Sequence, residues 1–83
     1  MGTVLITGAN RGLGLEFVRQ YNRAGWRVIA CSRSQSEALN ELAAASPHIS
    51  LHSVDVADHD SIERLAVDLQ DQPIDVLLNN AGI

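Results

Sequence analysis

The chain has 83 residues, of which 46% are hydrophobic and 19% are charged, and this composition is typical of one small globular domain rather than of a disordered segment. Its formal net charge is −4 and its six basic residues are scattered arginines, so no basic surface favours a nucleic-acid partner. A single cysteine excludes an internal disulfide and favours a cytoplasmic protein, and no segment reaches the roughly 20 apolar residues that a membrane-spanning helix needs.

Strands and helices are expected to alternate from the start of the chain. Residues 4–6 form an uninterrupted apolar run, which is typical of a strand buried on both faces. A helix is predicted from about residue 11 to residue 24, because apolar residues recur at helical spacing and a glycine follows. Residues 27–31 form the next apolar run and predict the second strand.

The middle of the chain carries a helix-start signal and a third strand. Ser34 and Glu37 make an S-x-x-E pattern, a capping box that predicts the start of the second helix. This helix is expected to end before Pro47, because proline removes a backbone donor and clashes with the preceding turn. Residues 49–54 follow as the third predicted strand.

A third helix and a fourth strand complete the predicted pattern. Asp58 is a candidate N-cap for a helix whose apolar stripe runs at i, i+3, i+4, i+7 spacing from Ile62 to Leu69, and residues 74–78 form the fourth strand. Strands that alternate with helices of this length imply right-handed crossovers. The predicted fold is an α/β Rossmann-type parallel sheet, βαβαβαβ, with strand order 3-2-1-4 and a ligand crevice between the first and fourth strands.

A glycine-rich segment joins the first strand to the first helix. Its spacing is G-x-x-x-G-x-G, from Gly8 through Gly12 to Gly14. Gly8 would let the chain leave the strand in a tight turn, Gly12 would let the backbone approach a pyrophosphate, and Gly14 would let the helix pack closely on the sheet. Unpaired N–H groups at the start of a helix attract phosphate, so this strand–turn–helix context predicts a dinucleotide site rather than an ordinary turn.

The segment T-G-x-x-x-G-x-G at residues 7–14, together with N-N-A-G at residues 79–82, resembles the short-chain dehydrogenase/reductase family. The resemblance covers all 83 residues. The string from Thr7 to Phe17 is similar to the branch that contains C-factor and the sniffer-type carbonyl reductases. Residues 1–83 are therefore expected to be the N-terminal dinucleotide-binding part of a single Rossmann-fold domain, incomplete relative to the full family fold.

The resemblance implies which residues bind the cofactor. Backbone groups of the glycine turn would line the pyrophosphate, an Asp-Val pair after the third strand would bracket the adenine, and the N-N-A-G segment would pass beneath the adenine ribose. Asn79 has two interpretations, a tie between neighbouring strands and a cofactor contact. The expected cofactor-binding residues are Gly8, Asn10, Arg11, Gly12, Leu13, Arg33, Asp55, Val56, Asn80, Ala81 and Gly82.

The residues after the second strand favour NADP over NAD. NAD-specific Rossmann domains place an acidic residue about 20 residues past the glycine turn, yet no acidic residue lies between Glu16 and Glu37. Arg33 stands near that position, and a guanidinium matches a 2′-phosphate with two charge-assisted hydrogen bonds. Arg11 resembles a basic position that NADP-dependent members use for the same phosphate. The alternative for each arginine is a solvated surface charge.

No catalytic residue and no metal site are expected in these 83 residues. The family uses a tyrosine with a lysine four residues later, but the one tyrosine here is Tyr21, Gly25 stands four residues later, and the chain has no lysine. Tyr21 is expected to pack in the core. The histidines lack metal-ligand spacing. Cys31 is expected to be a small buried hydrophobe rather than a reactive thiol.

Three hypotheses follow. The first is the NADP(H)-binding portion of an oxidoreductase that reduces a small carbonyl compound or oxidises the alcohol. Such a protein would bind that substrate and would bind neither nucleic acid nor membrane. Any oligomer would form through elements beyond Ile83. The alternative is a non-catalytic nucleotide-binding, signalling or interaction module of the C-factor type. The third is a fragment that does not fold stably, since an apolar fourth strand would leave an open sheet edge.

Overall fold

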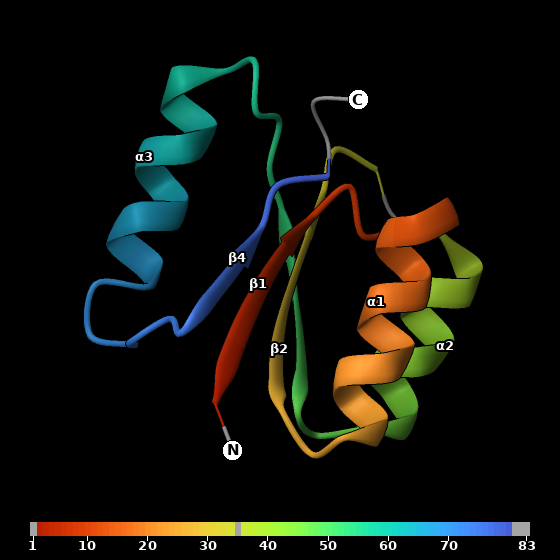
Figure 1. The fold of residues 1–83 in the computed structure, drawn as a ribbon. Helices are drawn as coiled ribbons and strands as arrows, with labels where there is room; N and C mark the ends of the chain where they lie inside the picture. The colour runs from red at the N-terminus through yellow and green to blue at the C-terminus, as the bar shows by residue number, and fades with distance from the viewer. Residues whose placement is uncertain (1, 35, 81–83) are drawn as a thin grey trace.

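The computed structural model describes residues 2–34 and 36–80, and it shows a parallel sheet with helices on both faces (Figure 1). Strands and helices alternate along these residues, as the sequence predicts. The order of the strands in the sheet is β3-β2-β1-β4, which confirms the predicted Rossmann-type α/β fold. The elements are β1 (Thr3–Thr7), α1 (Gly12–Arg23), β2 (Arg27–Ser32), α2 (Glu37–Ala45), β3 (Ile49–Ser53), α3 (His59–Asp68) and β4 (Val76–Leu78).

The two strands at the centre of the sheet supply most of the core. Successive side chains of a strand point to opposite faces, so β1 and β2 divide their apolar residues between two clusters. Val4, Ile6 and Val28 pack on the face that α1 and α2 cover (Figure 1). Leu5 and Ile29 pack on the opposite face, toward α3. Both strands are buried on both faces, as their continuous apolar runs predict.

β4 begins at residue 76, two residues later than the predicted strand over 74–78. The N–H group of Asp75 donates to the carbonyl oxygen of Thr3 at 2.9 Å, and the Asp75 carboxylate accepts from the N–H group of Thr3 at 2.8 Å. Pairing with β1 then starts at Val76, opposite Val4. The polar side chain at position 75 anchors the start of the strand, and Ile74 lies exposed before it.

α2 begins at a different serine from the one that the sequence predicts. Ser36 is the N-cap, because its Oγ accepts a hydrogen bond from the N–H group of Leu39 at 3.2 Å and the helix begins at Glu37. The predicted capping box of Ser34 and Glu37 is therefore wrong. Ser34 stays in the turn after β2, where its carbonyl oxygen accepts a hydrogen bond from the side chain of Asn10 at 3.1 Å.

α3 has the predicted N-cap but only part of the predicted apolar stripe. The Asp58 carboxylate accepts a hydrogen bond from the N–H group two residues later, at 3.0 Å. Leu65 and Leu69 pack against the sheet, whereas Ile62 and Ala66 are exposed. α3 is the one helix that the described residues place on this face, so the flank of its stripe meets no neighbouring element.

Candidate functional site

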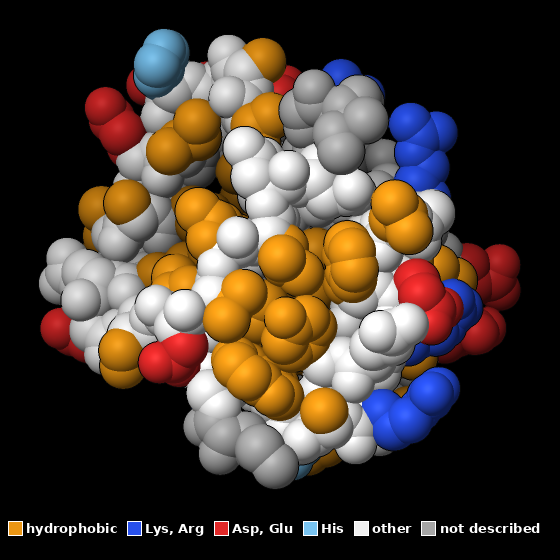
Figure 2. Space-filling model, in the orientation of Figure 1, with side chains coloured by type: hydrophobic (Ala, Val, Ile, Leu, Met, Phe, Trp, Pro, Cys, Tyr) orange, Lys and Arg blue, Asp and Glu red, His pale blue; other side chains and the backbone are white. Residues whose placement is uncertain are grey.

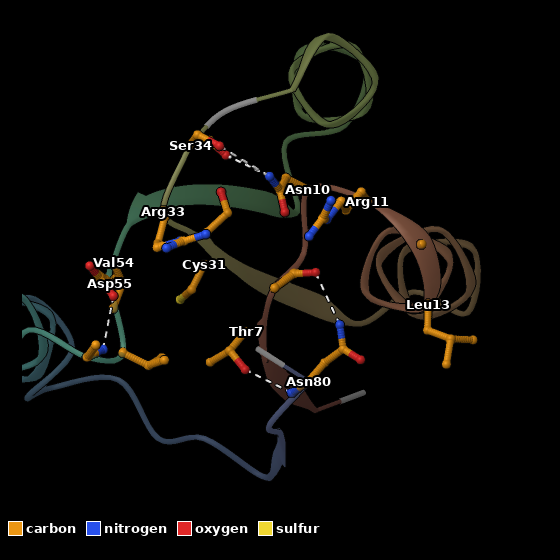
Figure 3. A pocket seen from close by; sticks show the side chains of 15 residues that line it. Thr7, Asn10, Arg11, Leu13, Cys31, Arg33, Ser34, Val54, Asp55 and Asn80 are labelled. Carbon is orange, nitrogen blue, oxygen red and sulfur yellow. Dashed lines mark hydrogen bonds between the residues drawn. The ribbon is translucent and has the colours of Figure 1, made fainter. Parts of the chain in front are cut away.

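A cavity of about 740 Å³ lies at the carboxyl ends of the strands, where the loops after β1, β2, β3 and β4 meet (Figure 3). Every predicted cofactor-binding residue that the structure describes lines it. Ala81 and Gly82 lie outside the described residues. The lining consists of Thr7, Gly8, Asn10, Arg11, Gly12, Leu13, Cys31, Ser32, Arg33, Ser34, Val54, Asp55, Val56, Ala57 and Asn80.

The lining includes residues that the sequence analysis did not select. Each lies within two positions of a predicted residue and stands near or just beyond the carboxyl end of a strand. Ligands bind at this end of parallel α/β sheets, so the predicted ends of the strands could have identified these residues as part of the lining. The additional residues are Thr7, Cys31, Ser32, Ser34, Val54 and Ala57.

The glycine turn after β1 has the geometry that its glycines allow. Gly8 and Gly12 adopt φ values of 62° and 58°, in the left-handed region that favours glycine. A Cβ at Gly14 would overlap the carbonyl oxygen of Gly8, so a side chain there would push α1 away from the turn. The N–H group of Ala9 donates to the carbonyl oxygen of Cys31 at 3.0 Å and joins the turn to β2.

The start of α1 offers backbone donors to the cavity. Arg11 is the extended N-cap residue and makes no side-chain capping bond. The N–H group of Leu15 donates to the carbonyl oxygen of Arg11 at 3.2 Å, whereas no hydrogen bond within residues 2–34 and 36–80 uses the N–H groups of Gly12 and Leu13. The first turn holds no acidic residue to offset the positive end of the helix. These donors suit a phosphate group.

Two asparagines fasten the end of β4 to the end of β1. The N–H group of Asn80 donates to the Oγ1 atom of Thr7 at 2.9 Å, and its side-chain amide donates to the carbonyl oxygen of Gly8 at 3.3 Å. The Thr7 hydroxyl lies 3.1 Å from the Oδ1 atom of Asn79 and donates to it. Asn79 thus makes the tie between strands that was one of its two interpretations, although its side chain is exposed rather than buried.

The loop after β3 forms another wall of the cavity. The Asp55 N–H group donates to the hydroxyl of Ser61 at 3.0 Å, and the Oδ1 atom of Asp55 accepts from the N–H group of Ala57 at 3.0 Å. This short turn holds the Asp55 carboxylate in place, and Val56 follows it with an exposed side chain. At this position the carboxylate can accept a hydrogen bond from a nucleotide base, and the exposed apolar side chain can pack against the ring of that base.

Arg11 and Arg33 border the cavity from two different loops, with Asn10 between them (Figure 3). Both arginines are exposed. Neither has an ion-pair partner among the described residues, where the one salt bridge joins Arg19 to Glu16 at 3.5 Å. Two unpaired guanidinium groups near the start of a helix make this end of the cavity suitable for an anion.

Cys31 lies under the cavity as a buried thiol. Burial raises its pKa from 9.0 to about 12, so it stays protonated and unreactive near neutral pH. Tyr21 packs against the core and meets the ring of Trp26 edge to face, with 5.0 Å between centroids. Both residues therefore have the packing roles that the sequence predicts.

Two further properties concern metal and membrane. Among the residues that the structure describes, no three or more histidine, cysteine, aspartate or glutamate side chains come together in a group that could hold a metal ion. Within the same part of the chain, no helix is long and apolar enough to cross a membrane.

Comparison with known proteins identifies the family. The sequence model described as short chain dehydrogenase matches residues 2–83. The chain belongs to the short-chain dehydrogenase family. The residues described here are accordingly a nucleotide-binding region of an oxidoreductase family, which accounts for a cavity at the carboxyl ends of a parallel sheet.

Relatives of this chain are named as dehydrogenases of different substrates. It is 41% identical to (+)-neomenthol dehydrogenase of Arabidopsis thaliana, over 95% of this chain and 30% of that protein. It is 40% identical to serine 3-dehydrogenase of Agrobacterium fabrum, over 99% of this chain and 34% of that protein. The chain thus spans about a third of the length of the curated relatives that it matches.

A solved structure has the same fold. A carbonyl reductase from Pseudomonas aeruginosa PAO1, solved in complex with NADP, superposes with a TM-score of 0.92 and 37% sequence identity. The match covers all of this chain and 39% of the reductase. The reductase therefore contains a region that is folded like this chain.

Proposed function

We propose that residues 1–83 form the NADP(H)-binding portion of an oxidoreductase that reduces a small carbonyl compound or oxidises the corresponding alcohol. The observation that carries the proposal is the pair of arginines, Arg11 and Arg33, which line one cavity with the start of α1. The described loop after β2 holds no carboxylate that would repel a 2′-phosphate. The NADP complex of the similar carbonyl reductase supports the choice of nucleotide.

The residues of the cavity fit the parts of such a nucleotide. The N–H groups of Gly12 and Leu13 would donate to the pyrophosphate, and Arg11 and Arg33 would bind the 2′-phosphate. Gly12 offers space for this approach, because a Cβ there would meet no atom within 4 Å. When bound, NADPH supplies the hydride that reduces a carbonyl carbon.

Other walls of the cavity would hold the remaining parts of the nucleotide. Asp55 and Val56 would bracket the adenine, and Asn80 would pass beneath the adenine ribose, followed by Ala81 and Gly82. Gly8 would shape the turn that carries the backbone donors, and Asn10 would line the cavity beside the nucleotide. These roles are part of the proposal, as is the small carbonyl or alcohol substrate.

The proton for the reaction would come from residues outside this chain segment. Tyr21 is packed against Trp26 and is followed by Gly25 rather than by a lysine, so it does not supply a proton donor. We propose that the tyrosine and lysine of the family's catalytic pair lie beyond Ile83, and that any surface for an oligomer lies there as well. A cytoplasmic location belongs to the same proposal, since Cys31 is a free thiol.

The substitution Arg33→Asp tests the choice of nucleotide. Removing charge-assisted hydrogen bonds and placing a carboxylate beside the phosphate should weaken NADPH binding about tenfold to a hundredfold. NADH, which has a 2′-hydroxyl that a carboxylate can accept from, should bind as well as before or better. Dissociation constants for both nucleotides can be measured by fluorescence titration of the whole gene product.

Arg64→Asp is the matched control, because Arg64 is an exposed arginine of α3 away from this cavity. It should leave both dissociation constants unchanged. Unchanged NADPH affinity in Arg33→Asp would overturn the proposed role of that residue. NADPH binding by the whole gene product without turnover of any carbonyl or alcohol would favour the non-catalytic, C-factor-like alternative.

A further inference from the structure

Asn10 connects two loops that border the proposed phosphate site. Its side chain leaves the glycine turn between β1 and α1 and reaches the turn after β2 (Figure 3). The Nδ2 atom donates to the carbonyl oxygen of Ser34 at 3.1 Å and lies 3.5 Å from the Ser34 hydroxyl oxygen. The two residues are 24 positions apart in the chain, so this bond is a tertiary contact across the cavity rim.

The described residues on either side of Arg33 and Ser34 have hydrogen-bond anchors, and Asn10 contacts Ser34 between them. At one end, the carbonyl oxygen of Ser32 accepts from the N–H group of Val54 at 2.9 Å. At the other end, Ser36 caps α2. Arg33 and Ser34 lie between these points and are exposed, and the side chain of Asn10 contacts Ser34, the residue next to Arg33. Asn10 therefore sets the path of the backbone that carries Arg33.

We propose that Asn10 is a positioning residue for nucleotide selection, which holds Arg33 over the cavity by fixing the Ser34 carbonyl. The inference rests on the proposed function, since it assigns Arg33 to the 2′-phosphate. An amide suits this task because it donates the required hydrogen bond and carries no charge. A carboxylate at the same place would lack the donor and would oppose the phosphate.

The effect of Asn10 should be confined to one part of the nucleotide. The glycine turn has its own anchors, namely the bond from Ala9 to the carbonyl oxygen of Cys31 and the bond from Asn80 to Gly8. Loss of the Asn10 amide would therefore leave the pyrophosphate donors in place. It would release the Arg33 turn, so that ordering Arg33 on the phosphate would cost conformational entropy.

The test compares NADPH with NADH in Asn10→Ala, using the whole gene product and direct dissociation constants. Loss of one ordering hydrogen bond should weaken NADPH binding about fivefold to tenfold, whereas NADH binding should change less than about twofold. Asn40→Ala is the matched control, because Asn40 is an exposed asparagine of α2 outside the cavity. It should leave both affinities unchanged.

A double-mutant comparison separates positioning from direct contact. If Asn10 acts through Arg33, Asn10→Ala should change NADPH affinity less than about twofold when Arg33 is already alanine. A full effect in that background, or an equal loss of NADPH and NADH in the single variant, would overturn the inference. Wild-type protein that binds neither nucleotide would overturn the proposed function itself, which distinguishes the two failures.

Discussion

Single residues shape the cavity by what they lack as much as by what they carry. Gly14 has no Cβ to strike the carbonyl oxygen of Gly8, and this absence lets α1 start directly above the turn. Gly12 has positive φ and open space where a side chain would stand. Gly14 thus serves the packing of α1 on the turn, and Gly12 serves the approach of a ligand to the backbone. The spacing of the glycines in the sequence predicts both roles.

Cys31 is expected to resist alkylation while the protein is folded. Burial raises the pKa of the thiol to about 12, so little thiolate is present at about pH 8. Iodoacetamide should leave Cys31 unlabelled in the native protein and label it in the urea-denatured protein, which mass measurement of the peptide that carries it would detect. Equal labelling rates in the two states would contradict the burial of this thiol.

The same pKa shift predicts a loss of stability in alkali. The unfolded thiol has the lower pKa of 9.0, so the unfolded chain loses its proton first as the pH rises. The contribution of Cys31 is complete below pH 9.0 and is lost progressively toward the folded pKa of about 12. Urea midpoints should fall less between about pH 8 and pH 10 in Cys31→Ala than in the wild-type protein.

At the scale of the element, local sequence signals predicted the presence of each helix and strand better than they predicted where each one begins and ends. The glycine spacing and the apolar period placed α1 within one residue of its observed span, Gly12–Arg23. β4 was predicted too long, because apolar Ile74 reads as part of the strand. Asp75 ends the ambiguity through its two bonds to Thr3, a residue at the other end of the chain.

The start of α2 provides a prediction at this scale. Ser36→Ala should destabilise the protein by about 1 kcal/mol, because the N–H group of Leu39 loses its capping acceptor. Ser34→Ala should cost less than half as much, roughly, since Ser34 stands outside the helix and its carbonyl bond to Asn10 remains. Urea unfolding of both variants measures the difference, and equal losses would contradict the assignment of Ser36 as the N-cap.

At the scale of the molecule, the parallel sheet gathers one functional edge and leaves apolar surface elsewhere. Every strand points the same way, so the loops after all four meet at one cavity (Figures 1 and 3). Figure 2 shows a continuous group of hydrophobic side chains in the orientation of Figure 1. Leu77 on β4 is 64% exposed and Val67 on α3 is 66% exposed. Such surface favours association.

Residues 1–83, prepared alone, are therefore expected to self-associate. β4 pairs with β1 on one side, and among the described residues its other side is an open edge. Leu77→Glu should reduce the association, because a charge on an edge strand opposes pairing with another chain. Sedimentation velocity over a range of concentrations measures this association. Glu41→Gln on α2, which is exposed and polar, is the control.

The sequence by itself determined the alternation of strands and helices, the strand order and the glycine turn, and the family resemblance added other residues that line the cavity. These follow from local period and spacing, and from the rule that parallel strands present their carboxyl ends together. Tertiary structure decided which serine caps α2 and where β4 begins. The N-cap follows from the bond between the Ser36 hydroxyl and the N–H group of Leu39. The start of β4 follows from the bonds between Asp75 and the distant residue Thr3.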